Sequence, residues 1–582
     1  MRHTDSIEKL IAGRLARHLP LDETHLAGLL ETPPSPEIGD YGLPCYALSK
    51  YLHKAPNDIA EDLRGKVELP EGVREAKADG PYLNFFLDRP AVTASVLKLI
   101  HGLGSAYGSD DVGAGKTIVI DFGSPNVAKD LGVHHLPSAV IGRALYRVYE
   151  KLGYRCAGIN FPGDWGTSFG SLIAAVERYD VPDPDALTVS DLQELYVRYT
   201  RDAAAQPELL QTARDAFARL EQGESRATAL WQAFRQIGLE EFDQVYGMLG
   251  VTFDHVNAES SYREQIDGMV RRLLDQGVAI ESAGALIVPL DDENLPPCMV
   301  RKSDGTSLYM SRDIPAAEHR WEQFRFEKCL YVTGSEQSLH FKQLKAVLKR
   351  MGYECADRIE HVNFGLIRMR DPETGKTRVG STRRGEMVLL KDLLQEAVSR
   401  ARAKIEESSG RFGQDADLDD LAAQVGIGAV VFSELSTRRT RDVIFDWDSM
   451  LDFEGDTGPY VQYAHARLSS ILRKAEQEVV DDVDFALLTL PEEWVLARHL
   501  AGFPAAVRRA AAESEPSVIA TYLLELCADF SSYYSAGMRD PDRRVLCPAD
   551  DLRAARLLLV DAARHVIRGG LELLGVAAPE RM

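Results

Sequence analysis

Residues 116–170 read KTIVIDFGSPNVAKDLGVHHLPSAVIGRALYRVYEKLGYRCAGINFPGDWGTSFG, and this stretch decides the fold. Lys116–Phe122 is a short apolar run rich in β-branched residues, which is typical of a buried parallel strand. A Gly-Ser-Pro-Asn break follows, and a helical pattern begins at Leu136. A second strand at Tyr154–Phe161 leads into the polar loop Gly163–Thr167. Strand, helix and returning strand predict a βαβ unit whose loops can hold a ligand at the strand ends.

The composition describes a large acidic chain. It has 582 residues, of which 45% are hydrophobic, and a formal net charge of −22. This length favours about three or four domains with sizeable cores. An acidic chain is not a general binder of polyanions, so any contact with nucleic acid must depend on local basic or aromatic surfaces.

The cysteines and the apolar runs indicate the cellular compartment in which the protein resides. Seven cysteines are scattered without CxxC spacing, so neither a disulfide framework nor a zinc site is indicated, and a reducing cytosol fits. No apolar run reaches the roughly 18 residues of a membrane span. The N-terminal segment has the pattern of an amphipathic helix rather than of a signal peptide. We therefore expect a cytoplasmic protein with no membrane segment and no protein-bound metal site.

Changes of periodicity divide the chain into three parts. Residues 1–92 have the pattern of a small α+β domain. Residues 110–390 alternate strands and helices, which predicts a doubly wound, Rossmann-type domain with a helical insertion at about 170–270. The alternation resumes with an expected strand at Ala285–Val288. Residues 391–582 are nearly all helical in pattern and indicate an all-α bundle. The predicted fold class is therefore multidomain α/β.

Several short motifs occur together along the chain. They are Gly39–Tyr41, Gly80–Phe86, Ser124–Lys129, Gly163–Thr167, Ser311–Asp313, Gln337–Phe341, Phe445–Trp447, Thr457–Arg467 and Pro579–Met582. In combination they resemble the motifs of arginyl-tRNA synthetases, which are class I aminoacyl-tRNA synthetases, over essentially the whole length. The resemblance implies a Rossmann-type class I catalytic domain between an N-terminal module that binds the tRNA elbow and a C-terminal anticodon-binding bundle.

The resemblance implies an arginine pocket at the strand ends. A guanidinium carries five donors in a planar fork, so it needs carboxylates, amide oxygens and an aromatic face. Tyr309 and Asp313 are four residues apart in a helix that would follow Leu308, so both project from one face. For Asp313 the alternative is a surface carboxylate paired with Arg312. The implied arginine-binding residues are Asp121, Asn126, Tyr309, Asp313 and Gln337.

The resemblance also implies an ATP site, and here the chain departs from the family. The signature His-x-Gly-His appears as Gly132-Val133-His134-His135. The first imidazole is missing, and a histidine replaces the glycine that lets adenine approach the backbone. Only His135 keeps the place of a donor to the α-phosphate. The implied ATP-binding residues are Gly132, His134, His135, Gly163, Asp164, Gly166, Gly334, Glu336, Val362 and Phe364.

The second class signature, Lys-Met-Ser-Lys, is also altered. Residues 379–385 read Val-Gly-Ser-Thr-Arg-Arg-Gly, and the first lysine is absent. Many family members lack it and rely on a lysine near the first signature, a role for which Lys129 is present. The resemblance then implies His135, Lys129, Ser381 and Arg383 as catalytic residues, and ATP and Mg²⁺ as cofactors.

Contacts with tRNA are implied at both ends of the chain. Asn84 and Phe86 would contact the elbow, and Tyr460, Tyr463 and Arg467 would stack on splayed anticodon bases. An aromatic helix core is the alternative for at least one of the two tyrosines.

Three functions fit the sequence. The first is an arginine–tRNA ligase that makes arginyl-adenylate from L-arginine and ATP and transfers the arginyl group to tRNA(Arg), with a monomer implied by the family. The second is a paralogue with an altered ATP site that transfers arginine to a different acceptor in specialised metabolism. The third is a protein that binds arginine or tRNA without catalysis.

Overall fold

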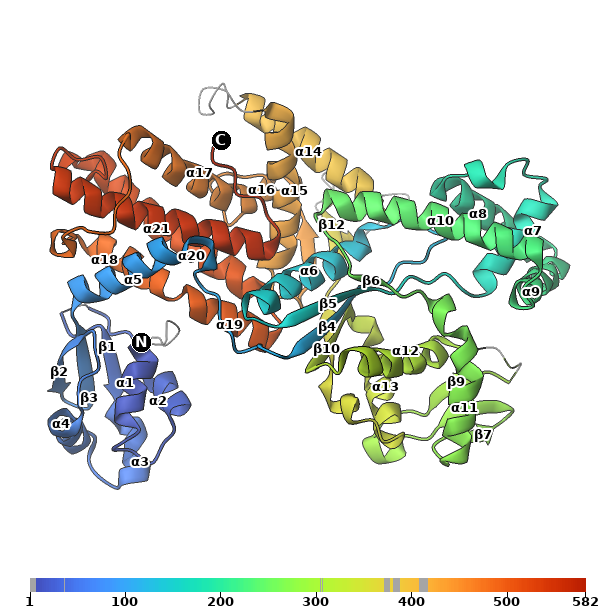
Figure 1. The fold of residues 1–582 in the computed structure, drawn as a ribbon, viewed down its shortest axis with the longest axis horizontal. Coiled ribbons are helices and arrows are strands. Elements are labelled where there is room, and N and C mark those ends of the chain that lie inside the picture. The colour runs from blue at the N-terminus through green and yellow to red at the C-terminus, as the bar shows by residue number, and fades with distance from the viewer. Residues whose placement is uncertain are drawn as a thin grey trace.

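The structure is a computed structural model, and it describes residues 7–35, 37–303, 305, 307–370, 377–379, 388–407 and 417–582. Figure 1 shows a central body built around a sheet, with a small N-terminal body and a helical bundle on one side and a helical extension on the other. Within the described residues, no helix combines the length and the apolar character that crossing a bilayer requires. All seven cysteines are free.

Five parallel strands form the central sheet, in the order β11-β10-β4-β5-β6. β4 (Thr117–Gly123) is central, between β10 (Lys328–Gly334) and β5 (Arg155–Asn160), and β11 (Ile359–Phe364) and β6 (His255–Val256) are the edges. Apolar, β-branched strands suit a sheet that is covered on both faces. The chain passes from β4 to β5 on one side and later returns to β10 on the other. A topological switch point, where such sheets bind ligands, therefore lies between β4 and β10.

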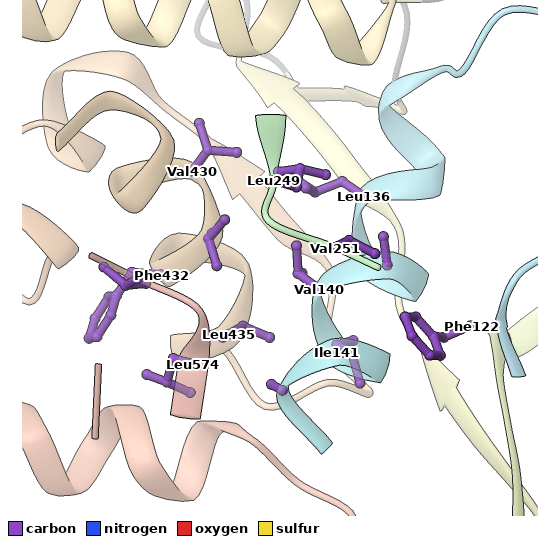
Figure 2. Packing of buried hydrophobic residues seen from close by; sticks show 14 of the residues in the cluster. Phe122, Leu136, Val140, Ile141, Leu249, Val251, Val430, Phe432, Leu435 and Leu574 are labelled. Atoms are coloured by element: carbon purple, nitrogen blue, oxygen red, sulfur yellow. The ribbon is translucent and has the colours of Figure 1, made fainter. Parts of the chain in front are cut away.

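Helix α6 (Leu136–Lys151) connects β4 to β5 and is buried on two sides. The Ser138 hydroxyl lies 3.0 Å from the carbonyl oxygen of Phe122 and 2.6 Å from that of Val332, which fixes the start of α6 at the ends of β4 and β10. Figure 2 shows Val140 and Ile141 of α6 with Phe122 of β4 on one side and residues of the helical bundle on the other. The sheet and the bundle therefore share one hydrophobic core.

Two insertions separate β5 from β10. The first is helical, and its helices are α7 (Thr167–Arg178), α8 (Val189–Ala205), α9 (Glu208–Glu221) and α10 (Ser225–Met248). The second combines α11 (Ile266–Asp275) and α12 (Tyr309–Phe324) with an antiparallel sheet of β7 (Ile280–Ser282), β8 (Ala285–Val288) and β9 (Cys298–Arg301). The expected strand at Ala285–Val288 forms, but its place in the parallel sheet was predicted wrongly. Only alternate residues of β8 are buried, as in a one-sided antiparallel sheet.

The N-terminal body is an antiparallel sheet with helices on one face. Its strands β1 (Tyr41–Pro44), β2 (Val73–Asp79) and β3 (Tyr82–Leu87) lie in the order β1-β3-β2. Its helices are α1 (Ile7–Leu15), α2 (Glu23–Leu29), α3 (Ser49–Leu52) and α4 (Pro56–Lys66). Helix α5 (Arg89–Leu103) leads from this body to the C-terminal bundle, where it packs on α18 and α21.

The C-terminal part is a helical bundle. Its main helices are α14 (Leu390–Glu407), α15 (Leu418–Ser436), α17 (Gly458–Ala475), α18 (Pro491–Ala501), α19 (Phe503–Glu513), α20 (Ser517–Arg539) and α21 (Asp550–Leu574). A small sheet of β12 (Ile367–Arg370), β13 (Thr377–Val379) and β14 (Val443–Phe445), together with α16 (Trp447–Met450), joins it to the central body. The predicted class is thus confirmed: a Rossmann-type sheet, an N-terminal α+β body and a C-terminal all-α bundle.

Glu434 of α15 yields the first prediction. Its side chain is buried in the bundle with Oε2 unpaired, and burial raises its pKa to about 8. At pH values between 4.5, the pKa of this group in the unfolded chain, and about 8, the unfolded chain has lost the proton while the folded chain keeps it. The free energy of unfolding therefore falls as pH rises through this range. Glu434→Gln should therefore stabilise the protein by a few kcal/mol at pH 8 and by little at pH 5.

Thermal unfolding at the two pH values measures this difference. Glu525→Gln on the exposed face of α20 is the matched control, and it should shift the midpoint equally at both pH values. An equal shift for Glu434→Gln would show that the buried carboxyl is not the source of the pH dependence.

Candidate functional site

The carboxyl ends of β4 and β10 meet at one crevice, around which the predicted arginine-binding residues lie. Asp121 is in β4, and Asn126 is in the loop after it. Gln337 ends the short turn after β10, immediately before α13 (Ser338–Arg350). Tyr309 and Asp313 open α12 with the predicted spacing of four residues. All five therefore surround the switch point of the sheet, where a small ligand can be reached from several elements.

Asp121 faces a guanidinium that belongs to the protein itself. Nη2 of Arg320 lies 2.7 Å from its Oδ2, and the Ser124 hydroxyl donates to its Oδ1 at 3.3 Å. Arg320 is 0% exposed, and its guanidinium lies 5.3 Å and 5.1 Å from the ring centroids of Phe161 and Tyr331. Burial alone would lower the pKa of Arg320, but Tyr331 and Asp121 hold it well above its usual range. The pair is thus ionic and internal.

This pairing gives both carboxylate oxygens of Asp121 a partner within the protein, from α12 and from the loop after β4. The direct contact of Asp121 with the substrate stays a prediction. Burial raises the pKa of Asp121, Arg320 opposes the rise, and the negative charge of Asp313 adds to it. Asp313 is therefore within electrostatic reach of Asp121. Asp121 and Arg320 therefore form a neutral floor beneath a crevice in which Asp313 supplies the negative charge.

Asp313 is held by a histidine that the sequence did not single out as a partner. Oδ2 of Asp313 lies 2.6 Å from Nε2 of His340 in the first turn of α13. The predicted alternative, an ion pair with Arg312, is wrong, because Arg312 pairs with Glu259 at 2.5 Å. Tyr309 is 70% exposed at the start of α12 and is open to a ligand.

The loop after β5 is fixed by buried polar contacts rather than left open. Asp164 accepts hydrogen bonds from the Ser260 backbone N and hydroxyl, at 2.8 and 2.7 Å, and from Nε of Arg235 at 2.9 Å. Its carboxylate is fully buried, so the expectation that Asp164 contacts ATP is not what the geometry favours. Burial, together with Asp313 and Asp164, raises the pKa of Glu259 to about 7 although Arg312 opposes the rise. These contacts fix the wall of the crevice beside α12.

The two histidines of the altered signature lie together at the start of α6. Their ring centroids are 4.0 Å apart, and Nδ1 of His135 lies 3.1 Å from the carbonyl oxygen of Gly132. Because a carbonyl only accepts, Nδ1 carries the proton, and Nε2 of a neutral ring is an acceptor. Burial lowers the pKa of His135 to about 3, and the adjacent His134 adds to this effect. In this state His135 is neutral at physiological pH.

The β10 side of the crevice faces His134. Burial lowers the pKa of His134, while the charges of Glu336 and Lys129 respectively raise and lower it, so both groups are within electrostatic reach of the imidazole. The Glu336 carboxylate folds back over Gly334, where any Cβ would come within 2.3 Å of its oxygens. The glycine at 334 leaves room for this placement of the Glu336 carboxylate, whose charge is within electrostatic reach of His134.

The remaining predicted ATP residues could face a nucleotide only through their backbone. Gly166 has φ of +131°, which favours glycine, and Gly163 pairs with the backbone at Asn126. Val362 and Phe364 of β11 have buried side chains, so only their main chain can face a nucleotide.

The first signature is also linked to the chain that follows the second. The backbone N of Val133 donates to Val388 O at 2.9 Å, and that of Leu390 donates to Leu131 O at 2.8 Å. Gly132 pairs with Leu389 in the same bridge. The predicted catalytic residues Ser381 and Arg383 lie outside the described residues.

The predicted elbow residues differ in their access to solvent. Asn84 is buried beside Gly42 and Lys77 in neighbouring strands, which corrects the expectation that it contacts RNA directly. Phe86 is half-buried, and Nζ of Lys77 lies 4.8 Å from its ring centroid. Tyr46, which is 52% exposed, is an accessible aromatic side chain on this body that the sequence analysis did not consider.

The predicted anticodon residues form one face of α17. Tyr460, Tyr463 and Arg467 follow each other at helical spacing and are half-buried. The Arg467 guanidinium lies 4.5 Å from the ring centroid of Tyr463 and 4.8 Å from that of Tyr534. The two tyrosines also pack against hydrophobic clusters of the bundle, so each has both a structural contact and an accessible edge.

Sequence reasoning missed Arg320, His340 and Glu259 as parts of this crevice. One signal was present for Arg320. It follows Met310, Ile314 and Ala317 on the buried face of α12, where a charge requires a partner. No pattern in the sequence connects it with Asp121, which lies on a different element.

Comparisons with known proteins cover the whole chain. The model for the catalytic domain of class I tRNA synthetases (R) matches residues 103–447, the DALR anticodon binding domain matches 461–582, and the arginyl tRNA synthetase N-terminal domain matches 5–87. The chain is 41% identical over 579 residues to an arginine–tRNA ligase of Clostridium botulinum (strain 657), covering 99% of this chain and 100% of that one. Identity is also 41% over 578 residues to an arginine–tRNA ligase of Clostridium perfringens, with the same coverage. The Thermus thermophilus arginyl-tRNA synthetase structure matches with a TM-score of 0.80 and 28% identity over 99% of both chains.

The buried Asp121–Arg320 pair gives a prediction for stability. Arg320→Met leaves the Asp121 carboxylate buried without its counter-ion, so it should destabilise the protein by roughly 3–5 kcal/mol. Adding Asp121→Asn removes the stranded charge and should recover part of this loss. The exposed pair Arg64–Glu61 provides the control, since Arg64→Met should cost no more than about 1 kcal/mol. Chemical unfolding of Arg320→Met, Asp121→Asn, their double variant and the control Arg64→Met measures the coupling, and additive effects at positions 121 and 320 would refute it.

Proposed function

This chain belongs to the arginyl-tRNA synthetase family, and we infer from this that it is an arginine–tRNA ligase. The supporting observation is the full-length 41% identity to arginine–tRNA ligases, in which the catalytic and anticodon-binding parts are both matched. The family resemblance read from the motifs is thereby confirmed. A paralogue that uses another acceptor is not favoured, because the match continues through the anticodon-binding part to residue 582.

The reaction has two steps that balance without a covalent enzyme intermediate. The carboxylate of L-arginine attacks the α-phosphorus of ATP, which forms arginyl-adenylate and releases pyrophosphate. A hydroxyl of the 3′-terminal ribose of tRNA then attacks the arginyl carbonyl, and AMP leaves. Positioning and charge stabilisation are the contributions required of the protein.

For arginine, we propose that Asp313 is the carboxylate that pairs with the substrate guanidinium. His340, 2.6 Å from Oδ2, holds the carboxylate in place. Tyr309 provides the aromatic face and Gln337 and Asn126 the amide groups, while Asp121 acts from below through Arg320. A planar guanidinium with donors on three sides fits such a mixed set of acceptors.

For ATP, we propose that His135 and Lys129 stabilise charge on the phosphates, with Ser381 and Arg383 acting from the second signature. Nδ1 of His135 is committed to the Gly132 carbonyl, so Nε2 can donate only after it takes up a proton. The phosphate charge of bound ATP favours that uptake, whereas the positive end of the α6 dipole, which attracts the anionic phosphates, disfavours a cationic imidazole at the N-cap. Glu336 would hold the ribose hydroxyls, and Gly132, Gly163, Gly166 and the backbone of Val362 and Phe364 would line the nucleotide.

Mg²⁺ fits this site as a companion of ATP. Among the residues that the structure describes, no group of three or more His, Cys, Asp or Glu side chains could hold a metal ion. Mg²⁺ commonly binds substrate phosphates with only one or two carboxylates, and it would supply neutralisation of the phosphate charge. We further propose that the chain works as a monomer in the cytoplasm.

Charging of tRNA(Arg) tests the function. The purified chain should attach arginine to tRNA(Arg) in the presence of ATP but should not attach citrulline, whose side chain has the same shape without the charge. Asp313→Asn should raise the KM for arginine by about 10- to 100-fold, as loss of one partner of a shielded ion pair does. Asp275→Asn on the exposed face of α11 is the control. Absence of charging by the unmodified chain would refute the ligase, and an unchanged KM in Asp313→Asn would refute the pocket.

The altered signature gives a separate prediction for ATP. The double substitution Gly132→His/His134→Gly restores the family pattern, and Gly132 has φ of −79°, which a histidine can adopt. Removing the His134 ring opens the space beside Glu336, so the KM for ATP should fall several-fold while the KM for arginine stays constant. Initial rates of charging at varied ATP measure this. A higher KM for ATP would mean that His134 belongs to a working arrangement of this loop.

A further inference from the structure

Four cationic side chains lie unpaired along one edge of the central sheet. Lys342 and Lys345 are on α13, and Arg438 and Arg441 are in the turn between α15 and β14. In the part of the chain that the structure describes, none of the four side chains has an ion pair or a hydrogen bond. They form a local positive cluster in a chain of net charge −22.

The four cations line two adjoining hollows at the β11 edge. One hollow, of about 310 Å³, is lined by Ser338, Phe341, Lys342, Lys345, His361 and Asn363. The other, of about 570 Å³, is lined by Arg438, Arg439, Thr440, Arg441, Glu513 and Glu515. We call these two hollows together the edge groove. In the view of Figure 1, α13 lies to the right of β10 and α19, which ends at Glu513, lies to its left.

Arg439 lines one hollow and contacts Asn363, which lines the other. Its Nη1 donates to the carbonyl oxygen and to Oδ1 of Asn363, at 2.6 and 2.8 Å, and its Nε donates to Ser514 O at 3.1 Å. These contacts cap the open edge of β11 and connect it to the start of the α19–α20 turn. The two hollows of the edge groove therefore meet at the contact of Arg439 with Asn363, between the central sheet and the C-terminal bundle.

The acids of the groove are already compensated. Glu513 pairs with Arg509 at 3.0 Å. Glu515 is buried, accepts a hydrogen bond from the Ser517 hydroxyl at 2.9 Å, and lies 3.9 Å from Arg439. Asp442, next to Arg441, pairs with Arg368 at 2.6 Å. The four cations therefore leave a net positive surface that can attract an anion.

We propose that the edge groove binds the sugar-phosphate backbone of tRNA between its acceptor end and its anticodon. This proposal rests on the ligase function, which requires one tRNA to reach both the strand ends and the helical bundle. The four cations belong to two separate elements and are at the rim of two open hollows. A chain of phosphates can contact all of them in succession, whereas a single small anion would be held at one hollow only.

Binding of labelled tRNA(Arg) over a range of KCl concentrations tests the groove. Lys342→Gln/Lys345→Gln and Arg438→Gln/Arg441→Gln each remove two charges. Each should reduce the slope of log Kd against log salt by about two and weaken binding by about 10-fold at low salt, since each lost phosphate contact lowers the slope by about one. The control Lys116→Gln/Lys349→Gln also removes two charges, from the far end of β4 and the last turn of α13, and should keep the original slope. Arg438→Lys/Arg441→Lys, which keeps the charges, should also keep it.

The outcomes separate the groove from the function and from its alternatives. The proposal would be overturned if both neutralised variants kept the original slope of log Kd against log salt and the original midpoint of thermal unfolding. The proposal would also be overturned if inorganic pyrophosphate inhibited charging less in the neutralised variants while their tRNA binding stayed unchanged. The groove would then be a site for a small anion. If the unmodified chain does not charge tRNA(Arg), the ligase function fails. If it charges normally and the neutralised variants have the original KM for tRNA, the groove alone fails.

Discussion

The burial of α6 on two sides is the constraint on which the rest of the structure depends. One side of the helix packs on β4 and the other packs against α15, α19 and α21, so its position is set by both the sheet and the bundle. The Ser138 hydroxyl then fixes the first turn at the ends of β4 and β10. Since the two histidines of the altered signature occupy the residues just before α6, their place is a consequence of this packing. A motion of the bundle against the sheet would disturb the packing of α6, which offers one physical route between the two bodies.

The deep carboxylates around the crevice are arranged as internal pairs, while Asp313 and Glu336 remain nearer the surface. Arg320 neutralises Asp121, Arg312 neutralises Glu259, and Arg235 and Ser260 satisfy Asp164. Only after these pairings can Asp313 act as the acceptor for a cationic substrate, because uncompensated carboxylates at this depth would favour protonation over binding. The same internal pairing explains how a strongly acidic chain can keep an isolated positive surface at the β11 edge.

The sequence predicted the elements better than the contacts. The strand at Lys116–Phe122 and the helix starting at Leu136 follow from apolar periodicity, which is a local property, and both are confirmed. The partners of Asp121, Asp164 and Asn84 depend instead on residues far along the chain, such as Arg320 and Ser260, and a pattern does not encode which distant side chain fills a given space. The strand at Ala285–Val288 shows the same limit at the level of a sheet. Its existence is local, but its assignment to an antiparallel sheet depends on which neighbours it meets.

The altered ATP signature also becomes less surprising when its contacts are considered together. A ligase needs positive potential at the phosphates, and under the proposed assignment the start of α6, Lys129 and the second signature would supply it together with imidazoles. In the described structure His135 is neutral, with Nδ1 bound to Gly132, so even the retained imidazole contributes fully only when bound phosphate favours the uptake of a proton at Nε2. Loss of the imidazole at position 132 therefore removes one of several donors. Because transition-state stabilisation is divided among these groups, the substitution is expected to change the rate of activation and the demand for ATP more than the identity of the reaction.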